Sequence, residues 1–148
     1  MIPSPRAFAI LRQFERLSLV AYEDPGGIYT IGYGATTLDG EPVEPGTTIT
    51  GSQADALLQM NVATVTDGLN AVLKVPVSQE QFDALVSWAF NIGVRAARES
   101  TLVLHLNSGK PYEAALEFVR WIYQGVEVLN GLIRRRIVEA ALFLDGTP

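Results

Sequence analysis

The spacing of apolar residues predicts a helix at the start of the chain. Apolar side chains recur at helical intervals from Phe8 to Leu17. Ser4 and Pro5 precede them, and a serine N-cap followed by proline in the first turn is a typical helix start. We expect this helix to end at or near Glu15.

A strand-rich segment follows. Two β-prone runs, residues 19–24 and 28–34, flank Pro25-Gly26-Gly27. Short β-rich runs around a Pro-Gly-Gly turn predict a hairpin. Residues 35–51 are rich in Thr, Gly and Pro, which favours either a third short strand or an irregular loop.

The rest of the chain has helical periodicity. Ser52 and Asp55 frame a short capping box, Ser78 opens a second helix, and Ser100 caps a third. The expected helices cover roughly residues 52–73, 78–91, 100–107, 111–125 and 131–144. Residues 1–148 are therefore expected to form a single α+β domain, in which a small N-terminal β-hairpin lobe packs with a mainly helical lobe. A cleft between two such lobes is a natural place for a site.

Composition and charge exclude several classes of protein. The 148 residues are 48% apolar and 18% charged, a globular balance that excludes a fully disordered chain. Cysteine is absent, which excludes disulfides, thiolate metal sites and cysteine nucleophiles. The net charge of −5 disfavours nucleic acid as a partner. The basic run Arg134-Arg135-Arg136 is interpreted as an ordinary helix face.

The sequence also bears on location. No uninterrupted apolar stretch approaches the ~18 residues of a membrane span, so no membrane insertion is expected. The N-terminus lacks a basic region followed by an apolar one, which argues against a cleaved secretory signal. We expect the protein to accumulate in the cytoplasm of the cell that makes it until another factor opens the inner membrane.

Three polar residues near the hairpin are candidates for chemistry. Glu15 lies beside Phe14 and Leu17, and apolar neighbours favour the protonated carboxyl group that a general acid needs. Asp24 precedes a polar glycine-rich turn that favours the ionised form, and Thr30 lies on the outgoing strand. Glycosidases use two carboxyl groups in contrasting environments. The same residues taken alone also fit a helix-terminal Glu and a turn-favouring Asp.

The spacing Glu15…Asp24…Thr30, inside Phe-Glu-Arg-Leu…Ala-Tyr-Glu-Asp-Pro-Gly-Gly-Ile-Tyr-Thr-Ile-Gly-Tyr-Gly, resembles the phage-type lysozymes, or endolysins, of glycoside hydrolase family 24. The similarity continues in order along nearly the whole chain. Residues 89–93 resemble the family's Phe-Asn-x-Gly segment, Ser-Thr-Leu follows at residues 100–102, and residues 131–136 resemble its Gly-Leu-x-x-Arg-Arg ending.

The resemblance implies a lysozyme-like fold and a muramidase. Such an enzyme hydrolyses the β-1,4 bond between N-acetylmuramic acid and N-acetylglucosamine in peptidoglycan. By position, Glu15 matches the general acid, Asp24 the carboxylate that stabilises the sugar cation and helps activate water, and Thr30 the hydroxyl that positions this water. An inverting enzyme of this kind separates its carboxyl groups by roughly 6.5–9.5 Å to admit the water.

Four residues are expected to bind substrate. Phe90, Asn91 and Gly93 come from the Phe-Asn-x-Gly segment, and Arg135 is the arginine whose position matches one that faces Glu15 in the family. The position of Asn91 is equally compatible with a hydrogen bond to acetamido groups of the substrate and with capping of its own helix. Core packing is favoured over sugar stacking for both tryptophans of the chain, at positions 88 and 121.

Two other interpretations are kept. A lytic transglycosylase needs no water-directing Asp, and a catalytically silent wall-binding module of a phage assembly needs no catalytic residues; Glu15, Asp24 and Thr30 argue against both. We expect a monomer that binds peptidoglycan strands, needs no metal or organic cofactor and is released by a pore-forming holin. Ala35, where many relatives have His, is expected to tolerate that substitution at a cost of no more than ~1–2 kcal/mol.

Overall fold

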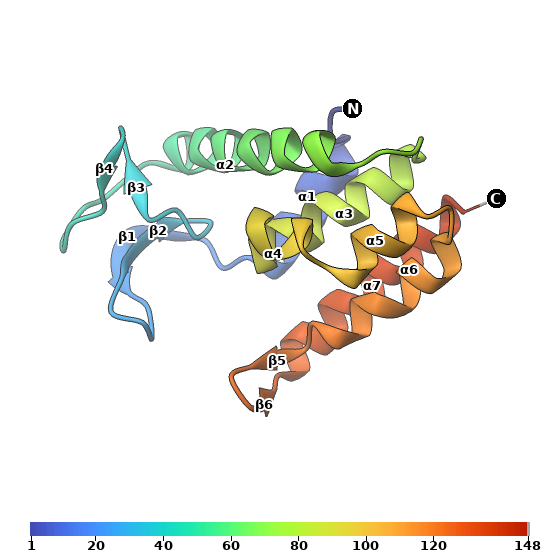
Figure 1. Ribbon diagram of the computed structural model, residues 1–148. Helices are drawn as coiled ribbons and strands as arrows, with labels where there is room; N and C mark the ends of the chain where they lie inside the picture. The colour runs from blue at the N-terminus through green and yellow to red at the C-terminus, as the bar shows by residue number, and fades with distance from the viewer. Residues whose placement is uncertain (148) are drawn as a thin grey trace. The chain divides into compact units, whose positions relative to one another are not determined.

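The computed structural model describes residues 1–147 and is rich in helices (Figure 1). Its internal contacts divide the chain into two units. The hairpin unit is Leu11–Ala63, and the helical unit consists of Met1–Ile10 and the chain from Thr64 onward. Helix α1 (Pro5–Phe14) and helix α2 (Gly51–Val72) each begin in one unit and end in the other.

The hairpin unit contains two small antiparallel strand pairs. Strand β1 (Ser18–Glu23) pairs with β2 (Tyr29–Gly32), with Tyr22 opposite Thr30. Strand β3 (Thr37–Leu38) pairs with β4 (Glu41–Pro42) in the segment for which the sequence allowed a strand or a loop. The first hairpin is confirmed, and the following segment is a second, shorter hairpin.

The core of the hairpin unit lies beneath these strands. Ile31 on β2 is fully buried, and it is followed by Gly32, at φ +65°, which lies beside Ile49 and Ala54. The buried residues that form this core are Ile31, Ala35, Val43, Ile49, Ala54 and Leu57. The core therefore joins the first hairpin to the first turns of α2.

The start of α2 corrects one prediction. Thr50 Oγ1 accepts a hydrogen bond from the Gln53 N–H at 3.2 Å, and Gln53 Oε1 accepts one from the Thr50 N–H at 2.8 Å. The capping box is thus Thr50–Gln53 rather than Ser52–Asp55. The longer glutamine side chain can reach back to the N-cap amide, whereas Asp55 pairs with Arg12 at 3.0 Å.

Besides the start of α1 and the end of α2, the helical unit contains six helical elements among the described residues. Their bounds are α3 (Gln79–Ile92), α4 (Val94–Arg98), α5 (Thr101–Asn107), α6 (Pro111–Glu117), the 3-10 helix η1 (Phe118–Arg120) and α7 (Asn130–Asp145). Ser78 opens α3 as expected, through a capping box with Gln81, and Ser100 caps α5 as expected. Helix α4 was not predicted. None of the helices in residues 1–147 combines the length and apolar character needed to cross a membrane.

Helix α3 is the centre of the helical unit and packs along α7 (Figure 1). All its residues from 81 to 89 are buried, including Trp88. Edge-to-face ring contacts extend from Trp88 to Phe118 at 5.8 Å and to Trp121 at 5.7 Å. The predicted core role of Trp88 is confirmed, and the end of α3 that follows it carries Phe90 and Asn91, with Gly93 as its C-cap.

One predicted helix is too long. The run from Pro111 was expected to remain helical to Gly125, but α6 and η1 end at Arg120. Strands β5 (Tyr123–Gln124) and β6 (Glu127–Val128) then form a hairpin whose turn includes Gly125, at φ +60°. A positive φ suits glycine and breaks the helix. The α+β class is confirmed, although the strands are not confined to the N-terminal part.

Candidate functional site

The tip of the β1–β2 hairpin holds Asp24 in a network of backbone bonds. Asp24 Oδ1 accepts hydrogen bonds from the N–H groups of Gly26 and Ile28, each at 2.8 Å. The backbone of Asp24 also bonds to Ile28, because its N–H donates to the Ile28 carbonyl at 2.9 Å. Within residues 1–147, Oδ2 makes no hydrogen bond. One carboxylate oxygen thus fixes the turn and the other is available to a ligand or water.

The turn sequence explains why Asp24 can be held in this way. A Cβ added to Gly26 would lie 3.2 Å from Asp24 Oδ1, and Gly27 has φ +80°. A side chain at Gly26 would crowd the carboxylate, and one at Gly27 would be strained. The Pro-Gly-Gly sequence therefore supplies the close approach that the two amide donors require.

Thr30 belongs to the same network. Its Oγ1 donates to the Ile28 carbonyl at 3.2 Å, and Ile28 is also the residue whose N–H binds Asp24. Thr30 is only 5% exposed, at the buried side of β2. Asp24 and Thr30 thus both bond to Ile28, and the hairpin thereby places the two candidate residues close together.

Glu15 is the first residue after α1, as expected. Its N–H donates to the Leu11 carbonyl at 2.8 Å, and its side chain is half-buried. Phe14 is half-buried too, whereas Leu17 is 44% exposed, so Leu17 contributes less apolar enclosure than its sequence position suggested. The carboxyl separation of roughly 6.5–9.5 Å remains a prediction.

An ion pair holds the helix end that carries Glu15. Arg12, one turn earlier on α1, binds Asp55 of α2 through Nη2 at 3.0 Å and Nε at 3.3 Å. The hydrogen bond to Asp55 is the main reason that the pKa of Arg12 is raised above its ordinary value. Both residues belong to the hairpin unit, and this exposed ion pair links the last turn of α1 to α2 within that unit.

The predicted substrate-binding residues lie in the helical unit. Phe90 is half-buried, Asn91 is exposed, and Gly93 closes α3 at φ +89° with its N–H bonded to the Ala89 carbonyl at 2.9 Å. Of these, Asn91 lines a pocket of about 610 Å³, which we call the Asn91 pocket. Its other lining residues are Ile92, Arg120, Trp121, Tyr123, Gln124, Leu129 and Leu132.

The Asn91 pocket combines an amide, a cation and aromatic rings. Trp121 is half-buried against Trp88 and also lines the pocket, so its role extends beyond the expected core packing. Tyr123 is exposed, and Arg120 pairs with Glu117 at 3.2 Å. Partly exposed aromatic rings and polar groups are suited to sugars, which have both apolar faces and hydroxyl groups.

Arg135 is almost completely buried, and its expected contact with substrate remains a prediction. It is 3% exposed; its Nη2 donates to the Ser87 carbonyl at 2.9 Å and its Nε to Glu139 at 3.0 Å. Its neighbour Arg136 was not singled out from the sequence, yet it is fully buried and reaches Asn91. Arg135 and Arg136 precede Glu139 at i,i+4 and i,i+3 spacing, a sequence signal that the interpretation as an ordinary helix face did not use.

Glu139 is the charged centre of the cluster. Its Oε1 accepts from Ser87 Oγ at 2.6 Å, and its Oε2 lies 2.8 Å from Arg136 Nε in an ion pair. Burial raises the pKa of the Glu139 carboxyl group, and the two guanidinium groups and Ser87 act in the opposite direction. A run of arginines interpreted as a solvated helix face is therefore, at two of its three positions, an interior ion cluster.

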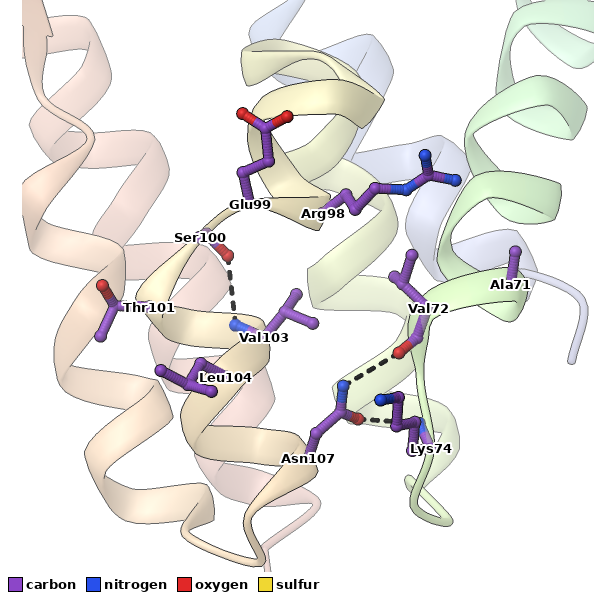
Figure 2. Close-up of a pocket in the computed structure, with 10 residues that line it drawn as sticks. All are labelled: Ala71, Val72, Lys74, Arg98, Glu99, Ser100, Thr101, Val103, Leu104 and Asn107. Atoms are coloured by element: carbon purple, nitrogen blue, oxygen red, sulfur yellow. Dashed lines mark hydrogen bonds between the residues drawn. The ribbon is translucent and has the colours of Figure 1, made fainter.

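A second pocket of about 620 Å³ lies between the end of α2 and helices α4 and α5 (Figure 2). Asn107 closes one side, because its Nδ2 donates to the Val72 carbonyl at 2.9 Å and its Oδ1 accepts from the Lys74 N–H at 2.7 Å. No predicted site residue lines this pocket. Asn107 here joins α5 to the last turn of α2.

Similarity to solved structures defines the class of the fold. The endolysin from Escherichia coli O157:H7 phage FAHEc1 matches 98% of this chain and 94% of its own, with 39% identity and a TM-score of 0.89. The muramidase domain of SpmX from Asticaccaulis excentricus matches 98% of this chain and 97% of its own, with 36% identity and a TM-score of 0.86. The architecture is therefore the lysozyme-like α+β fold.

The family follows from the sequence comparisons. The "Phage lysozyme" family model matches residues 12–139, and the chain belongs to the phage lysozyme family. It is 46% identical to the endolysin of Bacillus phage PZA over 141 residues, which cover 94% of this chain and 54% of that endolysin. The chain thus spans about half the length of this relative. The resemblance inferred from the Glu15…Asp24…Thr30 motif is confirmed at the level of the family.

Proposed function

We propose that residues 1–148 act as a single catalytic domain, an endolysin that hydrolyses the β-1,4 bond between N-acetylmuramic acid and N-acetylglucosamine. Membership of the phage lysozyme family supports the reaction class. The observation that carries the proposal is the hairpin tip, where Asp24 and Thr30 both bond to Ile28 and Asp24 Oδ2 makes no hydrogen bond within residues 1–147. Together these features support water-mediated hydrolysis.

The proposed mechanism assigns one task to each residue. Glu15 protonates the glycosidic oxygen as the bond breaks. Asp24 Oδ2 stabilises the positive charge on the sugar and accepts a proton from the attacking water, and Thr30 positions that water. Within residues 1–147, the donors that hold the Asp24 carboxyl group are the neutral backbone N–H groups of Gly26 and Ile28, which bind Oδ1 and leave Oδ2 for the sugar.

The helical unit is proposed to bind the glycan. Asn91 contacts it directly in the Asn91 pocket, and Phe90 and Gly93 shape the end of α3 that presents Asn91. Arg135 has a supporting role in this proposal, because its buried guanidinium holds Ser87 and Glu139. The substrate is peptidoglycan, and the chain is proposed to act as a monomer released from the host cytoplasm by a holin.

Product analysis tests the reaction. Purified peptidoglycan is digested with the full chain, and the soluble fragments are examined by mass spectrometry. Hydrolysis gives muropeptides with reducing ends, whereas a transglycosylase gives anhydro ends and a silent wall-binding module releases no fragments. Loss of turbidity of outer-membrane-permeabilised cells provides a second measure of cutting.

A further inference from the structure

The pocket between the end of α2 and helices α4 and α5, which we call the Arg98 pocket, is lined by residues of the helical unit alone. Two basic residues line it, Arg98 at the end of α4 and Lys74 just after α2. Figure 2 shows the Arg98 side chain extending toward α2, and the Lys74 side chain on the other side of the pocket, beside Asn107. Two positively charged groups therefore line the same cavity from different elements.

Neither cation has a partner in the part of the chain that the structure describes. Within residues 1–147, the Arg98 guanidinium and Lys74 Nζ make no ion pair and no hydrogen bond. The carboxylate that lines the pocket, Glu99, pairs with Arg95 at 3.5 Å and points away from Lys74 (Figure 2). Other exposed arginines do have carboxylate partners, in the pairs Arg6–Glu80, Arg12–Asp55 and Arg120–Glu117. The two cations of the Arg98 pocket are therefore available to an anionic ligand.

The arrangement of these donors favours a tetrahedral anion. A guanidinium group donates through a planar fork, and an ammonium group donates as a compact point charge. The lone pairs of a carboxylate lie close to one plane, whereas the oxygens of a phosphate group point in several directions. Because Arg98 and Lys74 lie on different sides of the pocket, a phosphate group can accept from both at once.

The pocket is much larger than a phosphate ion. Its volume of about 620 Å³ is in the range of roughly 300–1,000 Å³ that is usual for organic ligands. Apolar side chains form part of its wall, namely Ala71, Val72, Val103 and Leu104. The ligand should therefore carry carbon atoms beside its phosphate groups. A lipid bilayer is disfavoured, because an anionic headgroup layer would be brought against the Glu99 side chain, which is 64% exposed.

We propose that the Arg98 pocket binds an anionic polymer of polyols joined by phosphodiester groups. Arg98 and Lys74 contact phosphate oxygens, and the apolar wall contacts the carbon atoms of the polyol. Such a polymer is not cleaved, so this inference goes beyond the proposed function. It gives a chain of net charge −5 a local attachment to an anionic wall, because repulsion between more distant charges is screened over about 8 Å at physiological ionic strength.

The decisive variant is the double substitution Lys74→Gln/Arg98→Gln. Glutamine keeps a polar side chain at each position but removes the charge. Binding of a fluorescently labelled poly(glycerol phosphate) to the full chain is measured by fluorescence anisotropy at low and at physiological salt. We expect the variant to lose about tenfold or more in affinity, because hydrogen bonds from charged donors are the strong ones. Its melting temperature should be unchanged. Equal affinity of the variant and the wild type would overturn the proposal.

Lys110→Gln/Arg134→Gln is the matched control. Both positions are exposed, lie outside the Arg98 pocket and make no ion pair within residues 1–147. Each double variant removes two positive charges from a chain of net charge −5, so the two variants have the same net charge. The control should lose less than about threefold, since exposed and distant charges are screened. Equal losses for the two variants would show a general attraction and overturn the assignment to the pocket.

Competitors identify the chemistry and the source of the ligand. Inorganic phosphate and polyglutamate, at the same concentration of anionic groups, should not displace the polymer, and phosphatidylglycerol vesicles should not bind the chain. Displacement by phosphate would reduce the pocket to a site for the free ion, and displacement by polyglutamate would show that any polyanion suffices. Vesicle binding that is lost in Lys74→Gln/Arg98→Gln would identify a lipid headgroup instead. Each of these results would overturn the polymer as the ligand.

Failure of this inference can be separated from failure of the proposed function. Cutting is measured on peptidoglycan from which phosphate polymers have been removed, where Lys74→Gln/Arg98→Gln should match the wild type. If the wild type cuts this substrate but does not bind the polymer, the inference alone is wrong. If the wild type binds the polymer through Arg98 and Lys74 but does not cut, the muramidase proposal fails and the polymer site remains.

Discussion

The hairpin tip around Asp24 and the interior around Glu139 hold a carboxylate in opposite ways. Asp24 is half-buried, is bound by two neutral backbone N–H groups and keeps one oxygen without a hydrogen bond among the described residues. Glu139 is completely buried, and both of its oxygens contact charged or hydroxyl groups. The first arrangement leaves one carboxylate oxygen open to a ligand, whereas in the second the guanidinium groups of Arg135 and Arg136 balance the carboxylate charge.

In this chain, the carboxyl group with the shifted pKa is not the one proposed to act on the substrate. A buried carboxyl group with a raised pKa is a common indication of an active site. In this chain that description fits Glu139, whose partners are all internal and whose contact with the surface passes through Arg136 to Asn91. Substitutions of the two kinds of carboxylate should therefore have opposite consequences for activity and stability.

The largest expected effect on activity comes from Glu15→Gln. Glutamine keeps the size of the side chain but cannot deliver a proton to the departing glycosidic oxygen. General acid catalysis contributes about 10²–10⁴ in rate, and a poor leaving group calls for the upper end. Lysis of permeabilised cells is measured alongside thermal unfolding, which should be unchanged. Lysis within tenfold of the wild type would move the acid role to another carboxyl group, with Glu23 the first to test.

Glu139→Gln should have the opposite result. The substitution removes the negative charge that two buried guanidinium groups contact, and loss of one partner of a buried ion pair costs about 3–5 kcal/mol. Because glutamine still accepts hydrogen bonds, we expect the lower end of that range, measured by urea unfolding. Activity per folded molecule should fall far less than for Glu15→Gln. A stable but inactive variant would contradict the division of roles.

Asp24→Asn tests the hairpin tip. The amide oxygen of asparagine can still accept from the Gly26 and Ile28 N–H groups, so the turn should persist, but the charge proposed to stabilise the sugar cation is lost. We expect a rate lower by about 10²–10³, as for removal of one electrostatic stabiliser of a transition state. Asp24→Ala, which also loses both hydrogen bonds, should lower stability in addition. Equal melting temperatures for the two variants would show that the backbone bonds do not depend on Asp24.

What the sequence predicted well was local. The Pro-Gly-Gly turn, the cap of α3 by Ser78 and the position of Glu15 at a helix end depend on residues within a few positions of one another. Burial of Arg136 was missed because it depends on Glu139, and Glu139 depends on Ser87, 52 positions away. A run of arginines on a helix is usually solvated, so only tertiary packing distinguishes this one.

Two other misses arose from competing local patterns. Trp121 and Ile122 extend the apolar spacing of α6, which favoured a longer helix, whereas the positive φ at Gly125 selects the β5–β6 turn. At the start of α2, Ser52 and Asp55 imitate a capping box two positions after the real one. In both places the spacing was compatible with two structures, and side-chain reach or glycine conformation decided between them.

The buried position of Ala35 changes the loss of stability expected for Ala35→His. It was expected to tolerate histidine, but it is 3% exposed and bonds to Ile31 through both backbone groups, at 2.8 and 2.9 Å. An imidazole ring would overfill this core, which typically costs about 1–3 kcal/mol. If the hairpin tip functions independently of the core, Ala35→His will lower the melting temperature and keep full activity below it. Loss of turnover in the folded variant would tie the core to the chemistry.

The smallest expected effect concerns Thr50, which binds a backbone N–H through a side-chain oxygen as Asp24 does, but without charge. Thr50→Ala removes the 3.2 Å bond from the Gln53 N–H and leaves α2 without its N-cap oxygen. Such substitutions cost about 1 kcal/mol. Ser52→Ala, at the position predicted from the sequence, should leave stability within about 0.5 kcal/mol of the wild type. Urea unfolding of the two variants compares them directly, and a larger loss for Ser52→Ala would reverse the assignment of the cap. Neither variant should change lysis, because a neutral cap contributes to helix stability and not to charge at the site.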